Sequence, residues 1–586
     1  MVAAWGRGDC VAHCASGAQW TWGVLKKWFL YAISVWGGLL LLGGMCAGVG
    51  ALQLRSAANT IRNDNLSTND VQTFSREIAV SNALLKSARY NPGVQILRVV
   101  PGVSWVPEAL SAGSRAVSEV RSLLENGGAE IANLAVSGEL TPEPGVIDVD
   151  AAVLVAKNAQ LIADQLINLR SAVVEIGELH IPGVDDSRID NAVNKATDYL
   201  DVANSAVAAM KQMPQLIGSE TPVQYFVGIT NEAELRGIQG IIGEYAIVEF
   251  DRGTISVSRT GSNTDLVNPE TLPPELIGDY SQTYGETNTE WQNVNLSPFL
   301  DPAALQITNA WKLQTGESLD GVILLDTVAL AKWAIPKVGA VQSAQGRVLE
   351  TWEALADYLS NGVYFEFPVD QIARKQFQSA LAEKLIGAIT SSSLEPQQLL
   401  RSLAKPMING RVVVWLNNEL GSEFNRTFLA RSSESFPTEV VVGFNNWTAN
   451  KMDFYLKAMT SSQVECVGPR AWHTVNVLLE NSAKNAEGYP EYLTRRLDIS
   501  DGNPRMPGSY LDISIVVPAG SADFEVSLDD FDAPFDVHES EGGRTTVRLQ
   551  SEVNAGEVSN ISVRFRSDGR CDAYRVRTSP LRYGGE

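Results

Sequence analysis

Histidine and cysteine, on which many catalytic and metal sites depend, are scarce in this chain. Its 586 residues include four histidines and five cysteines. The histidines stand singly, at His13, His180, His473 and His538. A Ser-His-Asp triad or a histidine metal cluster needs several such side chains together, and their spacing does not indicate one. Cys10, Cys14 and His13 are also too few ligands for a closed zinc site.

Positive charge is in short supply as well. Lysine and arginine number 46 against 68 aspartates and glutamates, which gives a formal net charge of -22. Nucleic acid and anionic lipid head groups repel a body of this charge unless a local basic pocket intervenes. The composition therefore argues against nucleic acid as a partner.

Long hydrophobic runs are absent after the first tenth of the chain. The one such run, from Trp28 to Leu54, contains no charged residue and is bracketed by Lys26, Lys27 and Arg55. About 20 apolar residues span a bilayer. The run therefore predicts a single transmembrane helix at residues 28–54, which makes the lipid bilayer a partner.

The flanks of this helix predict its orientation. Positive charge before the run favours a cytoplasmic tail at residues 1–27 and places residues 55–586 outside the cell membrane. A cleaved signal peptide would have a shorter apolar core and a small-residue cleavage site. A lipoprotein signal at Cys46 is disfavoured by Met45 before it. We expect a retained single-pass anchor.

Only two cysteines, Cys466 and Cys571, then lie outside the membrane. An even pair in an oxidising compartment is more often a disulfide than a metal site. We therefore expect these two to be bonded to each other.

The length predicts several domains rather than one core, and 45% hydrophobic with 19% charged residues is typical of a folded chain. We expect an α+β multidomain protein that begins with the transmembrane helix. Three extracytoplasmic domains follow it: a helical stalk bundle at 55–220, a central three-layer α/β domain at 221–420 and an immunoglobulin-like β-sandwich at 436–586.

Each of these domains is predicted from its own periodicity. In the first, apolar residues at three- and four-residue steps, such as Val155, Ala159, Ile162 and Leu166, indicate packed helices. In the second, short apolar runs such as GVILLD (321–326) alternate with amphipathic helices such as 302–315. In the third, apolar residues alternate with polar ones. The bundle is interpreted as a spacer, with a sensor or partner-binding role as the alternative.

The stretch most typical of a site follows the first strand of the α/β domain. The apolar run Tyr225–Ile229 leads into a polar segment that carries Asn231, Glu232, Glu234 and Arg236. A hairpin that turns at Asp251-Arg252-Gly253 comes next. Loops at strand ends, held by a rigid sheet, often carry functional residues. We therefore expect a ligand site in this segment.

Four segments resemble the bacterial domain-of-unknown-function family 4012. They are NEAELRGIQGIIGEYAIVEFDRG (231–253), GVILLDTVALAKWAIPKVGAV (321–341), NKMDFYL (450–456) and GYPEYLTRR (488–496). The family is a membrane-anchored envelope protein without an assigned activity, so the resemblance implies location and architecture rather than chemistry.

The α/β block also resembles, more distantly, the catalytic domain of the LytR-CpsA-Psr family, which transfers glycopolymers from a polyprenyl pyrophosphate carrier to the cell wall. The resemblance implies that Arg236, Arg259 and Arg374 face the pyrophosphate, since guanidinium groups bind phosphate oxygens bidentately. It implies a magnesium ion held by Asp265. It makes Arg236, Arg259 and Asp265 the catalytic candidates.

Asn231 and Glu234, from the polar segment, complete the candidate ligand-binding set with the three arginines. The chain departs from the LytR-CpsA-Psr pattern where that family has Arg-Ser-Asp-Thr, since it reads Arg-Gly-Ile-Gln at 236–239. The alternative role for each arginine is a structural salt bridge, for example with Glu232, Glu234 or Asp370.

Two functions are consistent with these features. The first is an envelope-assembly protein that binds a polyprenyl-linked glycopolymer, with its transfer left open. The second is a non-catalytic scaffold or receptor that binds wall polymer or envelope proteins. Three guanidinium groups that converge with a carboxylate in one cleft would favour the first; a cleft with one arginine would favour the second.

Overall fold

The computed structural model of the chain describes residues 68–178, 186–267, 279–285, 290–391, 406–407, 409–417, 421–467, 470–496, 506–540, 543–568 and 574–582. The predicted tail and transmembrane segment, residues 1–27 and 28–54, lie outside these ranges. Within them, no helix has the length and apolarity needed to cross a membrane. Cys571 also lies outside, so its disulfide with Cys466, in β9 (Leu456–Val467), stays a prediction.

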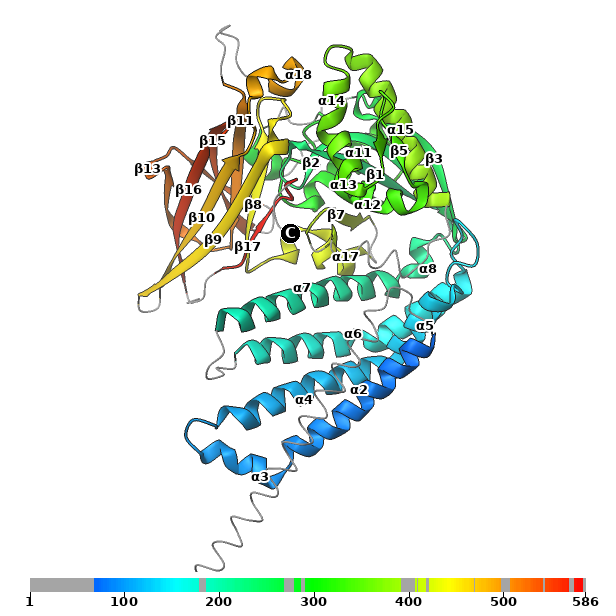
Figure 1. The fold of residues 1–586 in the computed structure, drawn as a ribbon, viewed down its shortest axis with the longest axis vertical. Coiled ribbons are helices and arrows are strands. Elements are labelled where there is room, and N and C mark those ends of the chain that lie inside the picture. Colours follow the sequence, from blue (N-terminus) through cyan, green and yellow to red (C-terminus); the bar gives the residue numbers. More distant parts are fainter. Residues whose placement is uncertain are drawn as a thin grey trace, which may run out of the picture. The chain divides into compact units, whose positions relative to one another are not determined.

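The chain is an α+β multidomain protein in which helices come first and mixed and antiparallel sheets follow (Figure 1). Its described residues fall into two compact units. One holds the residues up to Val136 together with Leu161–Leu200, and the other holds Ser137–Gln160 and Asp201–Glu586.

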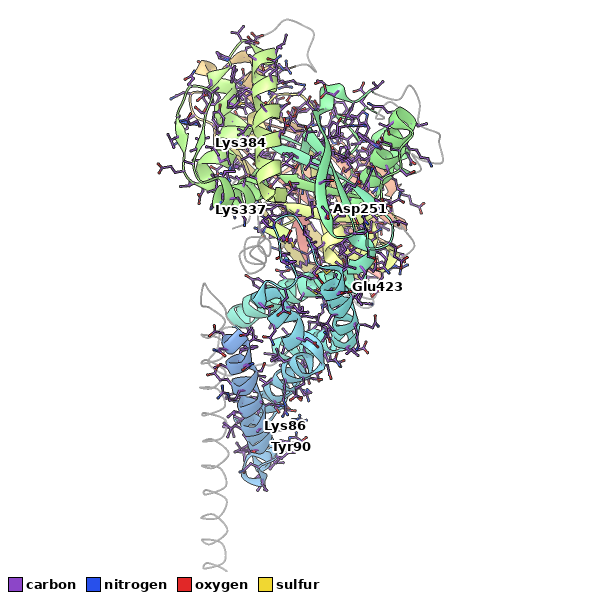
Figure 2. The ribbon with its side chains drawn as sticks, turned by 90° about the vertical axis from the view of Figure 1, so that its right-hand side faces the viewer. Lys86, Tyr90, Asp251, Lys337, Lys384 and Glu423 are labelled. Atoms are coloured by element: carbon purple, nitrogen blue, oxygen red, sulfur yellow. The ribbon has the colours of Figure 1, made fainter. Side chains whose placement is uncertain are left out.

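Helices make up the first unit. They are α2 (Thr68–Arg89), α3 (Pro92–Gln95), η1 (Ile96–Val99), α4 (Trp105–Leu123), η2 (Leu124–Gly128), α5 (Ala129–Ser137) and parts of α6 (Val149–Gly177) and α7 (Asp186–Lys211). A small core of Ile78, Leu85 and Val117 joins α2 to α4. Lys86 and Tyr90 mark the end of α2 in Figure 2. The predicted apolar stripe of α6 is buried, as packed helices require.

The second unit begins with a five-stranded mixed sheet of order β3-β2-β1-β4-β7. Its strands are β1 (Val223–Leu235), β2 (Gly240–Asp251), β3 (Thr254–Ser262), β4 (Gly321–Asp326) and β7 (Val412–Leu416). Among the described strands of this sheet, only β1 and β4 pair in parallel. The predicted hairpin is confirmed, because Arg252 and Gly253 both have positive φ, 48° and 79°, in the turn between β2 and β3.

Helices cover both faces of this sheet. On one face α11 (Leu300–Thr315) packs on the core that contains Tyr245 and Ile247. On the other face α12 (Thr327–Val338), α13 (Trp352–Asp357) and α15 (Gln371–Ser391) pack on the core that contains Ala246 and Val248. Alternate residues of β2 thus point to opposite helical layers. Side chains on opposite faces of this sheet therefore cannot line one site.

Smaller elements complete this half of the unit. They are α8 (Met213–Leu216), η3 (Asn263–Asp265), α10 (Asp279–Tyr284), β5 (Val341–Gln342), β6 (Val348–Leu349), η4 (Tyr358–Gly362), α14 (Val363–Glu366), α17 (Gly421–Phe424), η5 (Phe428–Ala430) and η6 (Ser433–Ser435). Lys211, at the end of α7, pairs with Glu423 of α17 at 2.5 Å; Figure 2 labels Glu423.

The first strand is longer than the sequence predicts. The polar segment expected to be a loop continues β1 as far as Leu235, with Asn231 opposite Ile241 and Leu235 opposite Gly240. Its buried polar groups find partners: Glu232 Oε1 accepts from Thr327 Oγ1 at 2.7 Å, and the backbone N–H of Leu235 donates to Asp453 Oδ2 at 3.0 Å. The segment is therefore an interior strand rather than an exposed loop.

Two five-stranded sheets form the C-terminal half of the unit and enclose one apolar core. One has the order β13-β12-β16-β10-β9 and the other β14-β15-β11-β8-β17. The remaining strands are β8 (Val440–Asn446), β10 (Arg470–Asn481), β11 (Gly508–Val517), β12 (Ala522–Leu528), β13 (Phe531–Asp532), β14 (Asp536–Ser540), β15 (Arg544–Asn554), β16 (Val558–Asp568) and β17 (Val576–Thr578). The short helices are η7 (Met452–Tyr455), η8 (Ala486–Gly488) and α18 (Glu491–Thr494).

The mixed sheet and this sandwich meet at the end of β1. Gly237 N–H donates to Asn445 Oδ1 at 2.9 Å, and Ser579 Oγ donates to Gly237 O. A Cβ atom at Gly237 would lie 2.0 Å from Leu296 O, and one at Gly240 would lie 2.1 Å from Asn231 O. The two glycines are therefore required because other backbone comes too close for any side chain.

Candidate functional site

Arg236 is buried and fully engaged by the protein. It is 5% exposed. Its Nε donates to Gln292 O and its Nη1 to Leu235 O, both at 2.9 Å, while its Nη2 donates to Glu234 Oε1 at 3.1 Å. The structural salt bridge considered as the alternative role of Arg236 is thus present.

Arg259 lies on the opposite face of the sheet from Arg374. It pairs with Ile247 on β2, so its side chain belongs to the face covered by α11. Its guanidinium lies 5.0 Å from the ring centre of Trp311 and 3.5 Å from Glu317 Oε1. Arg374 is on α15, which covers the other face. The structure therefore does not bring the three predicted arginines into one site.

Asp265 caps the short helix η3. Its Oδ2 accepts the N–H of Ser262 at 2.7 Å in a capping box. Within the described ranges, no group of three or more histidine, cysteine, aspartate or glutamate side chains is placed to hold a metal ion. A carboxylate committed to a helix cap, without such a group around it, does not fit the magnesium site that the resemblance implies.

Three of the predicted ligand-binding residues do meet. Asn231, Glu234 and Arg374 all line a cavity of about 230 Å³ beneath α15, which we call the basic cavity. Three further cations line it: Lys375, Lys451 and Arg495. Lys375 comes from α15, while Lys451 and Arg495 come from the segments between β8 and β11. Both halves of the second unit therefore build the cavity.

One of these cations is neutralised within the protein. Lys451 Nζ forms a buried ion pair with Glu234, which also accepts from Arg236. Burial alone would raise the pKa of Glu234, but Lys451 and Arg236 outweigh it and hold that pKa below its ordinary value. Burial likewise lowers the pKa of Lys451, and Glu234 more than compensates. Glu234 stays ionised as the link between Arg236 and the cavity.

Arg374 forms the cavity wall together with two tyrosines. Its Nε donates to Gln371 Oε1 at 2.7 Å and its Nη1 to Gln378. Its guanidinium carbon lies 4.9 Å from the ring centres of both Tyr364 and Tyr492, which stack on each other at 5.5 Å. Burial raises the pKa of Tyr492, but Lys451, Arg374 and Arg495 outweigh it and lower the net pKa. The cavity is strongly electropositive at this ring.

Lys375 and Arg495 form no direct ion pair with a residue that the structure describes. Lys375 Nζ donates to Asn263 Oδ1 at 3.4 Å. Burial lowers the pKa of this lysine, although Glu244 and Asp265 raise it in part. Arg495 stacks 4.0 Å from the ring centre of Tyr492, and its Nε is buried without any hydrogen-bond partner. Cations kept partly out of water without a direct ion pair are costly, so an anionic ligand would stabilise both.

Glu244 lines the same cavity from β2. Its Oε2 accepts from Ser379 Oγ of α15 at 2.8 Å. Burial raises the pKa of Glu244 to about 7, although the Ser379 hydrogen bond and the Lys375 ammonium lower it in part. The rest of the wall includes apolar side chains, namely Ile229, Ile241, Leu330, Leu359 and Ala382.

The four segments that carry the resemblance to family 4012 all reach this cavity. Residues 231–253 supply Asn231, Glu234 and Glu244, and residues 321–341 supply Leu330. Lys451 lies in 450–456, and Tyr492 and Arg495 lie in 488–496. Sequence reasoning missed Glu244, Lys375, Lys451, Tyr492 and Arg495 as site residues. The signal that could have found most of them was that these separate segments resemble one family.

Four cations and two carboxylates line the basic cavity, so it can bind an anion. The mixed-sheet half and the sandwich half of the second unit both contribute to it. Residues 220–364 match a family described as "Protein of unknown function (DUF4012)", which confirms the predicted resemblance over that range. The match covers two of the four resembling segments, and 450–456 and 488–496 lie beyond it. No curated protein and no solved structure matches the chain.

Proposed function

We propose that this chain is a membrane-anchored cell-envelope protein that binds the pyrophosphate head of a polyprenyl-linked glycopolymer without transferring it. The observation that carries the proposal is that four cations line the basic cavity against two carboxylates, while Lys375 and Arg495 form no direct ion pair with a described residue. The anchor and the extracytoplasmic placement rest on the apolar run at residues 28–54 and its basic flank.

Charge supports this class of ligand. A pyrophosphate that links a lipid to a sugar carries two negative charges, one on each phosphate. The four cations that line the basic cavity exceed its two carboxylates by two positive charges. A guanidinium group can donate two parallel hydrogen bonds to phosphate oxygens, and Arg495 Nε is free to take part.

Size supports binding of the head rather than of a whole polymer. Water occupies about 30 Å³ per molecule in the liquid, so a cavity of about 230 Å³ has room for several waters or for one pyrophosphate group. The sugar and the lipid would extend from it. The apolar side chains Ile229, Ile241 and Leu330 offer a surface for the first carbons next to the phosphate.

Several placements support binding without transfer. Arg236 is committed to protein acceptors, Arg259 is on the other face of the sheet, and Asp265 caps a helix. The arrangement therefore supports the binding part of the first hypothesis together with the non-catalytic character of the second. Recognition of an envelope polymer is common to both.

The test is titration calorimetry of the purified chain with citronellyl diphospho-N-acetylglucosamine, in which a two-isoprene tail replaces the polyprenyl chain. A charge-assisted contact contributes about 1.5–3 kcal/mol, or roughly a tenfold to hundredfold change in affinity. Lys375→Ala and Arg495→Ala should each weaken binding by about that factor. Arg259→Ala is the matched control, because it removes an arginine from the opposite face, and it should bind as the parent does.

Thermal melts of all variants distinguish lost binding from lost folding. The proposal fails if the folded parent does not bind the probe, or if Arg259→Ala weakens binding as much as Arg495→Ala does.

A further inference from the structure

Glu244 is an unusual residue for its place in the sheet. Its neighbours on the same face of β2, Ala246 and Val248, belong to the apolar core under α15. Glu244 instead presents a carboxylate to the basic cavity, where Ser379 Oγ donates to it at 2.8 Å. It forms no ion pair with any residue in the described part of the chain. A carboxylate kept partly out of water without an ion pair is costly, so its presence on this face indicates a role in the cavity.

The charged groups that face Glu244 come from two elements. Lys375 and Arg374 approach from α15 and favour its ionised form, while Asp265 of η3 opposes it. Burial is the largest influence and raises the pKa of Glu244 to about 7. Its carboxyl group therefore changes protonation near neutral pH, inside a site built for an anion.

We propose that an anion enters the basic cavity together with a proton that Glu244 takes up, so that the neutral carboxyl group donates a hydrogen bond to the bound phosphate. This inference rests on the proposed function and names the regulation of the same site. The proton comes from solvent, and no covalent bond in the ligand is made or broken.

The size of the cavity places an anion held there close to Glu244. A sphere of 230 Å³ has a radius of about 4 Å, so any group inside lies within a few ångströms of the walls. A phosphate charge and an ionised Glu244 would repel each other, at a cost of roughly tenfold to a hundredfold in affinity. Protonation replaces that repulsion with a hydrogen bond.

The experiment follows the dissociation constant of citronellyl diphospho-N-acetylglucosamine between pH 5.5 and 8.5. Both phosphates of this diester keep one charge throughout the range, so any pH dependence comes from the protein. We expect a constant affinity below about pH 6 and a loss approaching tenfold for each pH unit above 7. Titrations in buffers of different ionisation enthalpy should show uptake of up to one proton per ligand bound at pH 8.

Glu244→Gln should remove both signals, with an affinity at pH 8 within about threefold of its own value at pH 6. Burial also lowers the pKa of Lys375, so Lys375→Arg is the matched variant, and it should keep the pH dependence. The proton coupling is overturned if the parent binds with a flat pH profile. It is overturned equally if the slope survives in Glu244→Gln and disappears in Lys375→Arg.

The proton-uptake measurement on the parent needs no variant, so it decides the matter even if Glu244→Gln does not fold. Binding without proton uptake would overturn this inference and leave the proposed function standing. Absence of binding at every pH would overturn both.

Discussion

The buried and half-buried charged residues of this protein have two different roles, in the folded structure and in ligand binding. Arg236 and Glu234 are almost fully buried and form a paired network that reaches Lys451. Removing one member of such a network leaves an uncompensated buried charge, which costs about 3–5 kcal/mol. Lys375 and Arg495 are not paired in this way. We therefore assign Lys375 and Arg495 to ligand binding in the basic cavity.

Asp453 is a further buried carboxyl group, and it links the two halves of the second unit. It accepts from Leu235 N–H and from Asn446 Nδ2 at 2.7 Å. Burial raises its pKa from 3.8 to about 6. Because the folded-state pKa is raised, this group contributes stability that is fully present below about pH 4 and is lost as pH rises through 6.

We predict that the free energy of unfolding of the parent falls by roughly 2–3 kcal/mol between pH 4 and pH 7 through this group. Asp453→Asn should flatten that part of the profile, since an amide does not titrate. Denaturant unfolding at several pH values measures both proteins, and the difference between their profiles isolates Asp453 from other groups. An unchanged profile in Asp453→Asn would assign the pH dependence elsewhere.

At the scale of elements, the end of β1 is the centre of the second unit. It pairs with β2, receives Asn445 of β8 and is bonded to Asp453 of η7. Such close approach of three backbones leaves room only for glycine at two positions. The Arg-Gly-Ile-Gln sequence at 236–239 is therefore explained by packing.

Gly237→Ala should destabilise the second unit by about 1–3 kcal/mol or more, because its Cβ would overlap the backbone of Leu296. Gly387→Ala is the control, since a Cβ at this position on α15 meets nothing within 4 Å. Alanine there should be neutral or stabilising by up to about 1 kcal/mol. Equal unfolding midpoints for the two variants would contradict the close-approach argument.

At the scale of the whole molecule, the basic cavity belongs to neither half of the second unit alone. Glu244 and Arg374 come from the mixed sheet and its helix, and Lys451 and Arg495 come from the sandwich half. The C-terminal segment strengthens this union, since Arg411 Nη2 donates to Leu581 O at 2.7 Å. The chain as a whole carries a net charge of -22, whereas the basic cavity is locally positive. Anions are therefore attracted only near the cavity.

The proposed orientation predicts the outcome of proteolysis on intact cells. Protease added outside should degrade residues 55–586 and spare the tail at residues 1–27, because positive charge precedes the apolar run. Antibodies against an epitope tag at each end would report the two fates. Survival of the whole region after Arg55 in intact cells, with digestion after lysis, would reverse the orientation.

The sequence by itself determined the order of helices and sheets. The short apolar run GVILLD predicted β4 at Gly321–Asp326, and the turn at Arg252-Gly253 predicted the hairpin. These features follow from local backbone preferences and from the burial of one face of each element. Both depend on residues that are close in the sequence.

The site was decided only by the tertiary structure. The sequence placed Arg236 in a loop as a ligand-binding candidate, whereas the structure buries it and pairs it with Glu234. Lys375, Lys451 and Arg495 lie far apart along the chain and meet because α15 and the sandwich half close over one side of the sheet. Which face a side chain occupies, and which counter-ion reaches it, depends on that packing, because electrostatic interactions act through space and not along the chain.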